Sequence, residues 1–415
     1  MKKKLVREIA EFFGSLSNRE EVVTHVAFDS RQVKKGTLFF ALTGEKVDGH
    51  QFLEEVAKKG AIAAVVSNEY LGSSFGMELI PVSDVRKALQ SLAGEVFKDK
   101  NSLVIGITGT VGKTTAKEFI AGVLSEKFRV AKNPGSMNSQ VGLPLTILNW
   151  DGDDEILVLE MGMSEKGEIS RLIEIAPPEL CVLTKISLAH SAFFSDLEGI
   201  AEAKCELFKS KKIKHAFLNQ DTAEFKAVQE IQAPKTWFEK YIGKAPFSES
   251  QLLENLGAAV SVARYLGMSD EEILKGIQKL KPFKHRGEKI EKKGVLFIDD
   301  SYNASPIAAK AAFKSMPEGK KRVALFGAMK ELGAFEKESH REVAECAFPI
   351  IDELLCVGKE CQPMVDLFTQ KGKKAKLFAS KEEATKHLKK VMEPGDVVLL
   401  KGSNSFKLWT VLEEI

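Results

Sequence analysis

Residues 109–115, GTVGKTT, form a glycine-rich loop that follows an apolar run and precedes a helix-like stretch. A strand, a glycine loop and a helix in this order are the context in which many proteins bind phosphate. Gly109 and Gly112 let backbone N–H groups converge on phosphate oxygens, and the helix N-terminus adds partial positive charge. An ordinary glycine-rich turn is the alternative, but it has no need of a lysine followed by two threonines. The pattern therefore favours a nucleotide-binding loop.

The side chains of this loop suit the phosphates and the metal ion of ATP. Lys113 can neutralise the β and γ phosphates, and the hydroxyl of Thr114 can ligate magnesium. The spacing is GxxGKT rather than GxxxxGKT, so the generic motif is matched in part. The ATP contacts expected in the loop are Gly109, Thr110, Val111, Gly112, Lys113, Thr114 and Thr115.

Alternating strand-like and helix-like stretches must position this loop, and they indicate an α/β fold with three domains. Residues 1–98 predict a small α/β domain with the strand-like segments TLFFAL and AIAAVVS. Residues 99–284 contain the loop and predict a central P-loop ATPase domain with a mostly parallel sheet. Residues 285–415 repeat the rhythm through VLFIDD, RVALFG, ELLCVG and DVVLLKGS, which is typical of a Rossmann-like, doubly wound domain.

Composition excludes several classes of protein. The 60 Lys and Arg against 58 Asp and Glu leave a formal charge of +2, which gives no global field for a nucleic-acid partner. The five cysteines lack CxxC spacing, so reduced thiols in a cytoplasm are expected rather than disulfides or zinc. Glu8 and Glu11 interrupt any signal-peptide pattern, and no run reaches the ~18 apolar residues of a membrane span. We expect a cytoplasmic protein without membrane insertion.

The loop TGTVGKTT closely resembles the TGTNGKT loop of the Mur ligases, which build the peptide of bacterial cell-wall precursors. Further segments are similar to this family in the same order. DDSYNA followed by MKELG favours the dipeptide-adding branch over the tripeptide-forming one, whose DNPR motif is not found. The resembling segments are EMGMSEKGEI, AHSAFF, IAEAKCELF, DDSYNASP, LFGAMKELG and LLKGS.

The resemblance implies an ATP-dependent ligase with two substrates, UDP-N-acetylmuramoyl-tripeptide and D-alanyl-D-alanine. In this family the substrate carboxylate attacks the γ phosphate of ATP, and the incoming amine then displaces phosphate from the acyl phosphate. The reaction belongs to peptidoglycan precursor synthesis in the cytoplasm. We expect a monomer, and the third residue of the tripeptide is either diaminopimelate or lysine.

The resemblance also implies catalytic residues and two magnesium sites. Thr114 and Glu160 would hold one ion, because ligand sites collect where parallel strands such as EILVLE end. His190 matches the family histidine associated with a second metal. Lys204, in AEAKCELF, falls where these ligases carry a lysine carbamylated by carbon dioxide, a change that turns a cation into a metal-binding anion. With Lys113 these residues form the expected catalytic set; the alternatives are a structural carboxylate, a packing histidine and a surface lysine.

Other residues match the family's nucleotide contacts. Asp300 ends VLFIDD and matches the aspartate that hydrogen-bonds the ATP ribose, with Tyr302 and Asn303 beside it. Arg286, in the basic junction KLKPFKHRGEK, matches an arginine that reaches the phosphates, or is a solvated linker charge. Asn255 is a possible adenine contact. The third domain is therefore expected to complete the active site by closing on the second.

The segment DSRQVKKGTLFFALTGEKVDGHQF looks like the N-terminal uridine-nucleotide motif of two family members. Arginine suits a diphosphate because its planar fork pairs with two oxygens at once. The expected contacts with the uridine nucleotide are Ser30, Arg31, Gly44, Asp48, Gly49 and His50.

Departures from the family pattern concern adenine and acceptor binding. Val111 and Lys185 stand where asparagines are usual, Ala328 replaces an aspartate, and Asn404 replaces an arginine. Two alternatives to the dipeptide-adding ligase remain. A related ligase, such as the tripeptide-forming Mur ligase or folylpolyglutamate synthase, is one, although the latter has no uridine domain. A non-catalytic nucleotide-binding protein is the other, although it would not need metal and carbamate positions.

Overall fold

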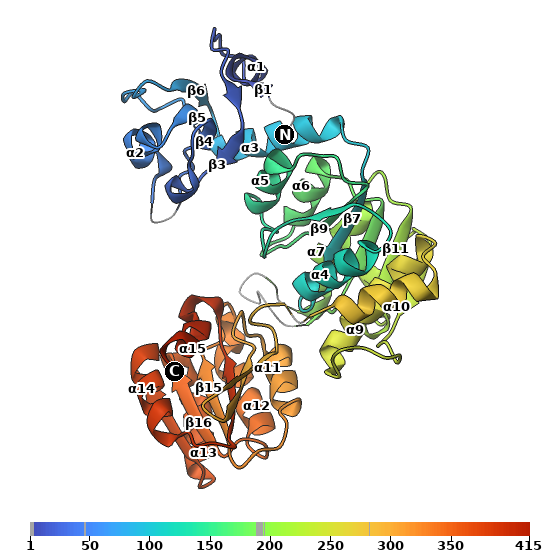
Figure 1. Cartoon of the computed structure of the whole chain (residues 1–415), viewed down its shortest axis with the longest axis vertical. Coiled ribbons are helices and arrows are strands. Elements are labelled where there is room, and N and C mark those ends of the chain that lie inside the picture. Colours follow the sequence, from blue (N-terminus) through green and yellow to red (C-terminus); the bar gives the residue numbers. More distant parts are fainter. Residues whose placement is uncertain (1–3, 45–46, 188–193, 195, 282) are drawn as a thin grey trace.

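The computed structural model describes residues 4–44, 47–187, 194, 196–281 and 283–415. Three α/β units follow one another in chain order, from the N-terminal unit at the top of Figure 1 to the C-terminal unit at the bottom. Each unit is built on its own main sheet, and in the described residues these sheets have four, six and six strands; β1 and β2 form a further two-stranded sheet in the N-terminal unit. The predicted α/β fold with three units is thereby confirmed.

The N-terminal unit contains a parallel sheet in the order β3-β4-β5-β6. Side chains of β4 alternate between its two faces: Leu38 and Phe40 pack on one face, and Phe39 packs on the other. Both faces are buried, which explains why this strand reads as an unbroken apolar run. The elements are β1 (Lys4–Leu5), α1 (Val6–Phe12), β2 (Val22–Val23), β3 (His25–Ala27), η1 (Ser30–Gln32), β4 (Thr37–Phe40), η2 (Gly49–Phe52), α2 (Leu53–Lys58), β5 (Ala61–Ser67), β6 (Glu78–Val82) and α3 (Val85–Lys98).

The central unit has a fully parallel sheet among its described strands, in the order β12-β11-β10-β7-β9-β8. β9 sends Ile156 and Val158 to the face covered by α4, α9 and α10, and sends Leu157 and Leu159 to the opposite face. The elements are β7 (Leu103–Thr108), α4 (Lys113–Leu124), β8 (Val130–Lys132), α5 (Gly142–Asn149), β9 (Ile156–Glu160), α6 (Glu168–Ile175), β10 (Leu180–Leu183), α7 (Leu197–Cys205), η3 (Glu206–Lys209), β11 (His215–Asn219), η4 (Gln220–Thr222), α8 (Lys226–Gln229), β12 (Lys235–Phe238), α9 (Ser250–Tyr265) and α10 (Asp270–Lys279).

The C-terminal unit has the sheet order β13-β14-β18-β15-β16-β17, in which β13 alone among the described strands is antiparallel to its neighbour. Helices pack on both faces, as in doubly wound folds. The elements are β13 (Glu288–Lys292), β14 (Val295–Asp299), α11 (Pro306–Lys314), β15 (Arg322–Gly327), η5 (Gly333–Phe335), α12 (Glu336–Ala347), β16 (Glu353–Val357), η6 (Lys359–Cys361), α13 (Gln362–Gln370), β17 (Lys374–Phe378), α14 (Lys381–Val391), β18 (Val397–Lys401), η7 (Asn404–Phe406), η8 (Leu408–Thr410) and α15 (Val411–Glu414).

The helices are of ordinary length for a globular protein. The helix α9 has 16 residues and α3 has 14, whereas crossing a bilayer takes about 20 apolar residues. Among the described residues, no helix combines the length and the apolar character that a membrane crossing demands.

The helix α3 and the side chain of Asn149 attach the N-terminal unit to the central unit. α3 shares one apolar core with α5 and α6. Asn149, the last residue of α5, accepts a hydrogen bond from the N–H of Val26 and donates one to its carbonyl, both at 2.9 Å. The amide of Asn149 thus occupies the free edge of β3 as a neighbouring strand would, which satisfies backbone groups that an edge strand leaves unpaired.

Replacing Asn149 tests this attachment. Asn149→Ala removes both hydrogen bonds to Val26 and should lower the free energy of unfolding of the N-terminal unit by about 1–3 kcal/mol. The loss is measured by urea denaturation, as the decrease in the free energy of the first unfolding transition. Asn101→Ala, at an exposed asparagine just after α3, is the control and should unfold as the wild type does. An unchanged first transition in Asn149→Ala would show that this edge contact does not hold the units together.

Candidate active site

The glycine loop lies where β7 ends and α4 begins, and its backbone is set by neighbouring residues. Gly109 and Gly112 have φ values of +147° and +92°, in the range that side chains disfavour. A Cβ atom on Gly112 would lie 2.4 Å from Oδ1 of Asn255. The loop is also bound by the segment after β10, since Thr184 donates its hydroxyl to the carbonyl of Val111 at 2.7 Å. The loop therefore has one tightly enclosed conformation.

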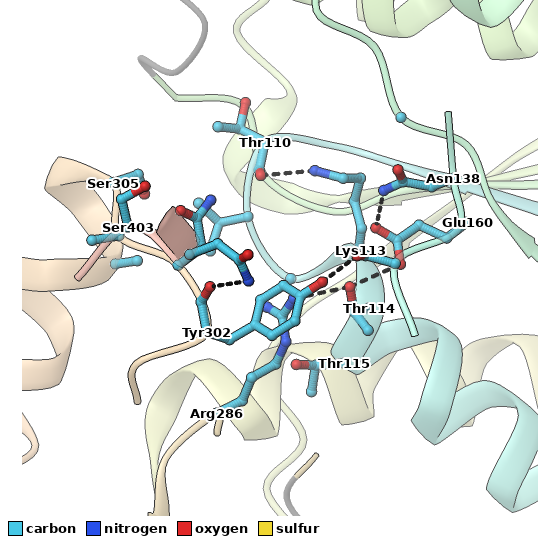
Figure 2. Close-up of a pocket in the computed structure, with 18 of the residues that line it drawn as sticks. Thr110, Lys113, Thr114, Thr115, Asn138, Glu160, Arg286, Tyr302, Ser305 and Ser403 are labelled. Carbon is cyan, nitrogen blue, oxygen red and sulfur yellow. Dashed lines mark hydrogen bonds between the residues drawn. The ribbon is translucent and has the colours of Figure 1, made fainter. Parts of the chain in front are cut away.

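Lys113 is the first residue of α4, and its amine folds back over the loop. Nζ donates to the carbonyls of Gly109 and Thr110 at 2.8 and 3.0 Å, and Figure 2 shows the side chain reaching toward Thr110. Burial lowers the pKa of Lys113, while the charge of Glu160 acts in the opposite direction. The lysine and the N-terminus of α4 thus place positive charge at the mouth of the loop.

Glu160 is the last residue of β9 and is almost fully buried, with 1% of its surface exposed. Its Oε2 accepts a hydrogen bond from the Thr114 hydroxyl at 2.8 Å, and its Oε1 accepts one from the amide of Asn138 at 2.6 Å. A carboxylate and a hydroxyl are the hard oxygen ligands that Mg²⁺ takes in nucleotide sites. The donor set of Thr114 and Glu160 therefore fits this ion.

Arg286 and Tyr302 reach into the same site from the C-terminal unit. Nη2 of Arg286 donates to the Thr114 hydroxyl at 3.1 Å, and the guanidinium lies 4.3 Å from the centre of the Tyr302 ring. The Tyr302 hydroxyl is hydrogen-bonded to that of Ser136 in the central unit. Within the described residues, Nε of Arg286 is buried without a hydrogen-bond partner. Leaving such a donor unpaired is energetically costly.

The preceding residue fixes Arg286 in place. His285 has a φ of +63°, an uncommon conformation for a residue with a side chain. Its Nδ1 donates to the fully buried Asp299 at 2.6 Å, and its ring stacks on Trp409 at a centroid distance of 5.0 Å. These contacts hold the turn between the central and C-terminal units so that Arg286 points to the loop.

Asp300 follows β14 directly, one residue beyond the end of that strand. Lys401, at the end of β18, contacts Oδ2 of Asp300 at 2.8 Å and donates to the carbonyl of Asn303 at 2.8 Å. Burial raises the pKa of Asp300, and the charge of Lys401 opposes that shift. The carboxylate is thus held at the carboxyl end of the sheet, where ligands bind in doubly wound folds.

These residues line one cavity of about 690 Å³ between the central and C-terminal units. It brings together most of the nucleotide contacts predicted from the sequence. Gly109 shapes the loop without lining the cavity, and His190 lies outside the described residues. The predicted residues that line the cavity are Thr110, Val111, Gly112, Lys113, Thr114, Thr115, Glu160, Asn255, Arg286, Asp300, Tyr302 and Asn303.

Lys204 lies on α7 and does not line this cavity. Its surface is 2% exposed, so the protein encloses almost the whole side chain. Burial lowers the pKa of Lys204 well below its usual range, and the nearby charge of Lys113 lowers it further. Both effects favour the neutral amine more than at an exposed lysine.

The residues predicted for the uridine nucleotide lie apart from the cavity, in the N-terminal unit. Ser30 and Arg31 follow β3, and the loop with Gly44, Asp48, Gly49 and His50 follows β4, so both groups lie at the carboxyl ends of adjacent parallel strands. Arg31 pairs with Asp29 at 2.6 Å, and 85% of its side chain is exposed.

His50 and Gly49 organise their own loop. His50 donates from Nδ1 to Asp48 at 2.6 Å and accepts from the backbone N–H of Ser67 at Nε2, 2.9 Å away. A Cβ atom on Gly49 would lie 2.8 Å from the backbone of Leu42. Nδ1 of His50 thus holds the loop together internally, and Nε2 attaches it to the end of β5.

Sequence reasoning missed Ser136 and Asn138, which contact Tyr302 and Glu160 from the segment between β8 and α5. That segment has no regular secondary structure, so neither periodicity nor a strand end indicates where its side chains point. The pair Pro134 and Gly135 marks a turn there and is the signal that the sequence offers.

The enclosed loop predicts a sharp response to one added methyl group. Gly112→Ala must adopt a left-handed conformation and also displace Asn255, so the affinity for ADP should fall by about tenfold or more while the fold persists. Isothermal titration calorimetry measures the affinity. Gly94→Ala is the control because its Cβ atom would meet nothing closer than 3.9 Å. Equal ADP affinity in Gly112→Ala and wild type would contradict the enclosed geometry.

Comparison with known proteins finds similarity to Mur ligases in all three units. Residues 22–96 match the model described as Mur ligase family, catalytic domain. Residues 107–253 match the Mur ligase middle domain, and residues 285–404 match the Mur ligase, glutamate ligase domain. A protein of Bacillus subtilis (strain 168) is 32% identical over 100% of this chain and 99% of its own length. That protein is named UDP-N-acetylmuramoyl-tripeptide–D-alanyl-D-alanine ligase.

Solved structures of Mur ligases are also similar to this chain. The crystal structure of the MurF ligase from Thermotoga maritima in complex with ADP is 32% identical, with a TM-score of 0.79, and the match covers 94% of this chain and 96% of that one. A structure of MurF from Acinetobacter baumannii is 25% identical, with a TM-score of 0.85 and coverage of 100% and 99%. With such similarity from end to end, the chain belongs to the Mur ligase family.

Proposed function

We propose that this chain is an ATP-dependent ligase that joins UDP-N-acetylmuramoyl-tripeptide to D-alanyl-D-alanine. The observation that carries the proposal is one cavity in which a phosphate loop, an oxygen pair suited to Mg²⁺ and the cations of two units meet. The similar protein of B. subtilis is named for this reaction, and the T. maritima ligase binds ADP in its crystal structure. The reaction is one of peptidoglycan precursor synthesis.

The chemistry takes two steps. A carboxylate oxygen of the tripeptide attacks the γ phosphorus of ATP, ADP leaves, and an acyl phosphate forms. The amine nitrogen of the dipeptide then attacks the acyl carbon, the amine loses a proton, and inorganic phosphate leaves as the amide forms. Both ATP and the tripeptide carboxylate are anions, so the site has to supply positive charge where they meet.

The residues divide this work between the two units. Lys113 and the N-terminus of α4 would receive the β and γ phosphates, and Arg286 would approach the phosphates from the other side. Thr114 and Glu160 would hold Mg²⁺, which draws charge from the phosphoryl group when bound. Asp300 would accept hydrogen bonds from the ribose. Orientation by both units brings the reacting atoms together.

We further propose that Lys204 is carbamylated and, with His190, serves a second magnesium ion. Carbamylation needs a neutral amine, and burial favours that form of Lys204. The resulting anion would also offset the charge of Lys113, which now disfavours a second cation beside it. The fully buried position supports a chemical role rather than that of a surface lysine.

The N-terminal unit would bind the uridine nucleotide through Ser30, Arg31 and the loop of residues 44–50. The exposed guanidinium of Arg31 supports this assignment, because it can pair with a diphosphate. We place the domain boundaries after Lys98, where α3 ends, and before His285, in the turn that precedes β13. We also propose that the enzyme works in the cytoplasm as a monomer, without a nucleic-acid partner.

The alternative functions differ in the substrate that ATP hydrolysis would require. A tripeptide-forming ligase or a folylpolyglutamate synthase would add an amino acid, and a non-catalytic nucleotide-binding protein would turn nothing over. The match of residues 22–96 to a Mur ligase domain favours a muramyl substrate over a folate.

Substrate dependence of phosphate release tests the proposal. Release from ATP is expected only when UDP-N-acetylmuramoyl-tripeptide and D-alanyl-D-alanine are both present. Coupled colorimetric assays should be run with each substrate alone, with both, and with the dipeptide replaced by a single amino acid. Lys113→Ala is the matched blank and should fold normally but release no phosphate above background. Release that is indifferent to either substrate would exclude the proposed reaction.

Chemical rescue tests the carbamate at Lys204. Lys204→Ala and Lys204→Arg should both lose most activity, because neither can form the carbamate. Acetate or formate should restore activity to the alanine variant by supplying an anion in the vacated space, whereas methylammonium should not. Lys209→Ala, at an exposed lysine on η3, is the control and should stay active. A fully active arginine variant, or rescue by the amine, would mean that Lys204 acts as a cation.

A further inference from the structure

Lys117 is a fully buried lysine one turn beyond the phosphate loop, on the first half of α4. A buried ammonium group is costly unless hydrogen bonds and opposite charge surround it. Its Nζ donates to the carbonyls of Asn133 and Gly135 at 2.7 and 2.5 Å. Carboxylate oxygens of Glu118 and Glu160 lie 3.4 and 3.9 Å from Nζ. None of the steps proposed above uses this cation.

The segment that Lys117 holds, residues 133–138, contacts Glu160 from several directions. Asn133 accepts a hydrogen bond from the Glu160 N–H at 2.9 Å and donates one to its carbonyl at 3.1 Å. Asn138 donates to Oε1 of Glu160 at 2.6 Å. Ser136, between them, meets Tyr302 of the C-terminal unit. The segment therefore links the expected metal ligand to the unit that covers the cavity.

We propose that Lys117 is a positioning residue that fixes residues 133–138. In this position Asn138 donates a hydrogen bond to Oε1 of Glu160, and Oε2 faces Thr114 and is left to bind Mg²⁺. The inference rests on the proposed function, since it assumes that Mg²⁺ binds between Thr114 and Glu160. The two carbonyls lie on either side of Pro134, so one ammonium group sets the turn on which Asn138 depends. Lys117 acts through that turn rather than on the nucleotide.

A simpler role would be that of a counter-ion for Glu160, and the two roles predict opposite results. If Lys117 only neutralised the carboxylate, removing its charge would strengthen Mg²⁺ binding, because a competing cation would be gone. If Lys117 positions the segment, removing it frees Asn138, and Glu160 no longer presents one defined oxygen. Mg²⁺ binding then weakens.

The experiment compares Lys117→Met, which keeps the length and apolar character of the side chain, with the wild type. Calorimetry of ADP binding at a series of Mg²⁺ concentrations measures both the metal-free affinity and the half-saturating Mg²⁺. Lys117→Met should raise the half-saturating Mg²⁺ by about tenfold or more and leave the metal-free ADP affinity nearly unchanged. Lys132→Met is the matched control: Lys132 also pairs with Glu118, but is exposed, so its loss should change neither quantity.

Asn138→Ala provides a second route that removes no buried charge. It should raise the half-saturating Mg²⁺ to a similar degree, and the double variant should be no worse than Lys117→Met alone. Stronger Mg²⁺ binding in Lys117→Met, an equal loss of ADP affinity with and without Mg²⁺, or an unaffected Asn138→Ala would each overturn the proposal. Nucleotide binding needs neither muramyl substrate nor dipeptide, so these results are independent of whether the chain performs the proposed ligation.

Discussion

Positive charge is concentrated around one buried carboxylate, Glu160, and the arrangement of the nucleotide site depends on this imbalance. Lys113 and Lys117 interact with the charge of Glu160, and Arg286 and Lys204 interact with the charge of Lys113. Burial lowers the pKa of all three lysines, which means that their charged forms are costly without further anions. Under the proposed function, a nucleoside triphosphate would supply anions beside Lys113 and Arg286, and a carbamate at Lys204 would supply another. The site is therefore built to be completed by its ligands.

The nucleotide site is formed by residues of both the central and the C-terminal unit. The loop and Glu160 lie at the carboxyl ends of β7 and β9, while Asp300 and Lys401 lie at the carboxyl ends of β14 and β18 in another sheet. Among the residues that the structure describes, Arg286 contacts Thr114 and Tyr302 contacts Ser136 across the two units at this site. The C-terminal unit thus contributes Arg286 and Tyr302 to the lining of the cavity.

Features that depend on strand ends and on short local motifs could be predicted from the sequence. The glycine loop, Glu160 at the end of an apolar run and the three α/β units follow from patterns within short segments, and the structure has all of them in place. Ser136 and Asn138 could not be predicted, because their positions depend on a turn held by Lys117 from another element. Likewise Lys185, which departs from the family pattern, bonds through its carbonyl to the loop and through its amine to Glu254. The backbone contact does not depend on the side chain, so the substitution is compatible with the loop.

Transfer of oxygen from the substrate carboxylate to phosphate tests the central claim most directly. The tripeptide carboxylate would be labelled with oxygen-18 in UDP-N-acetylmuramoyl-tripeptide and incubated with ATP, Mg²⁺, D-alanyl-D-alanine and the enzyme. Attack by this carboxylate on the γ phosphate leaves one of its oxygens in the inorganic phosphate that the amine displaces. Mass spectrometry of the phosphate should therefore detect one labelled oxygen per amide formed. Unlabelled phosphate, released while amide is made, would contradict the acyl-phosphate account.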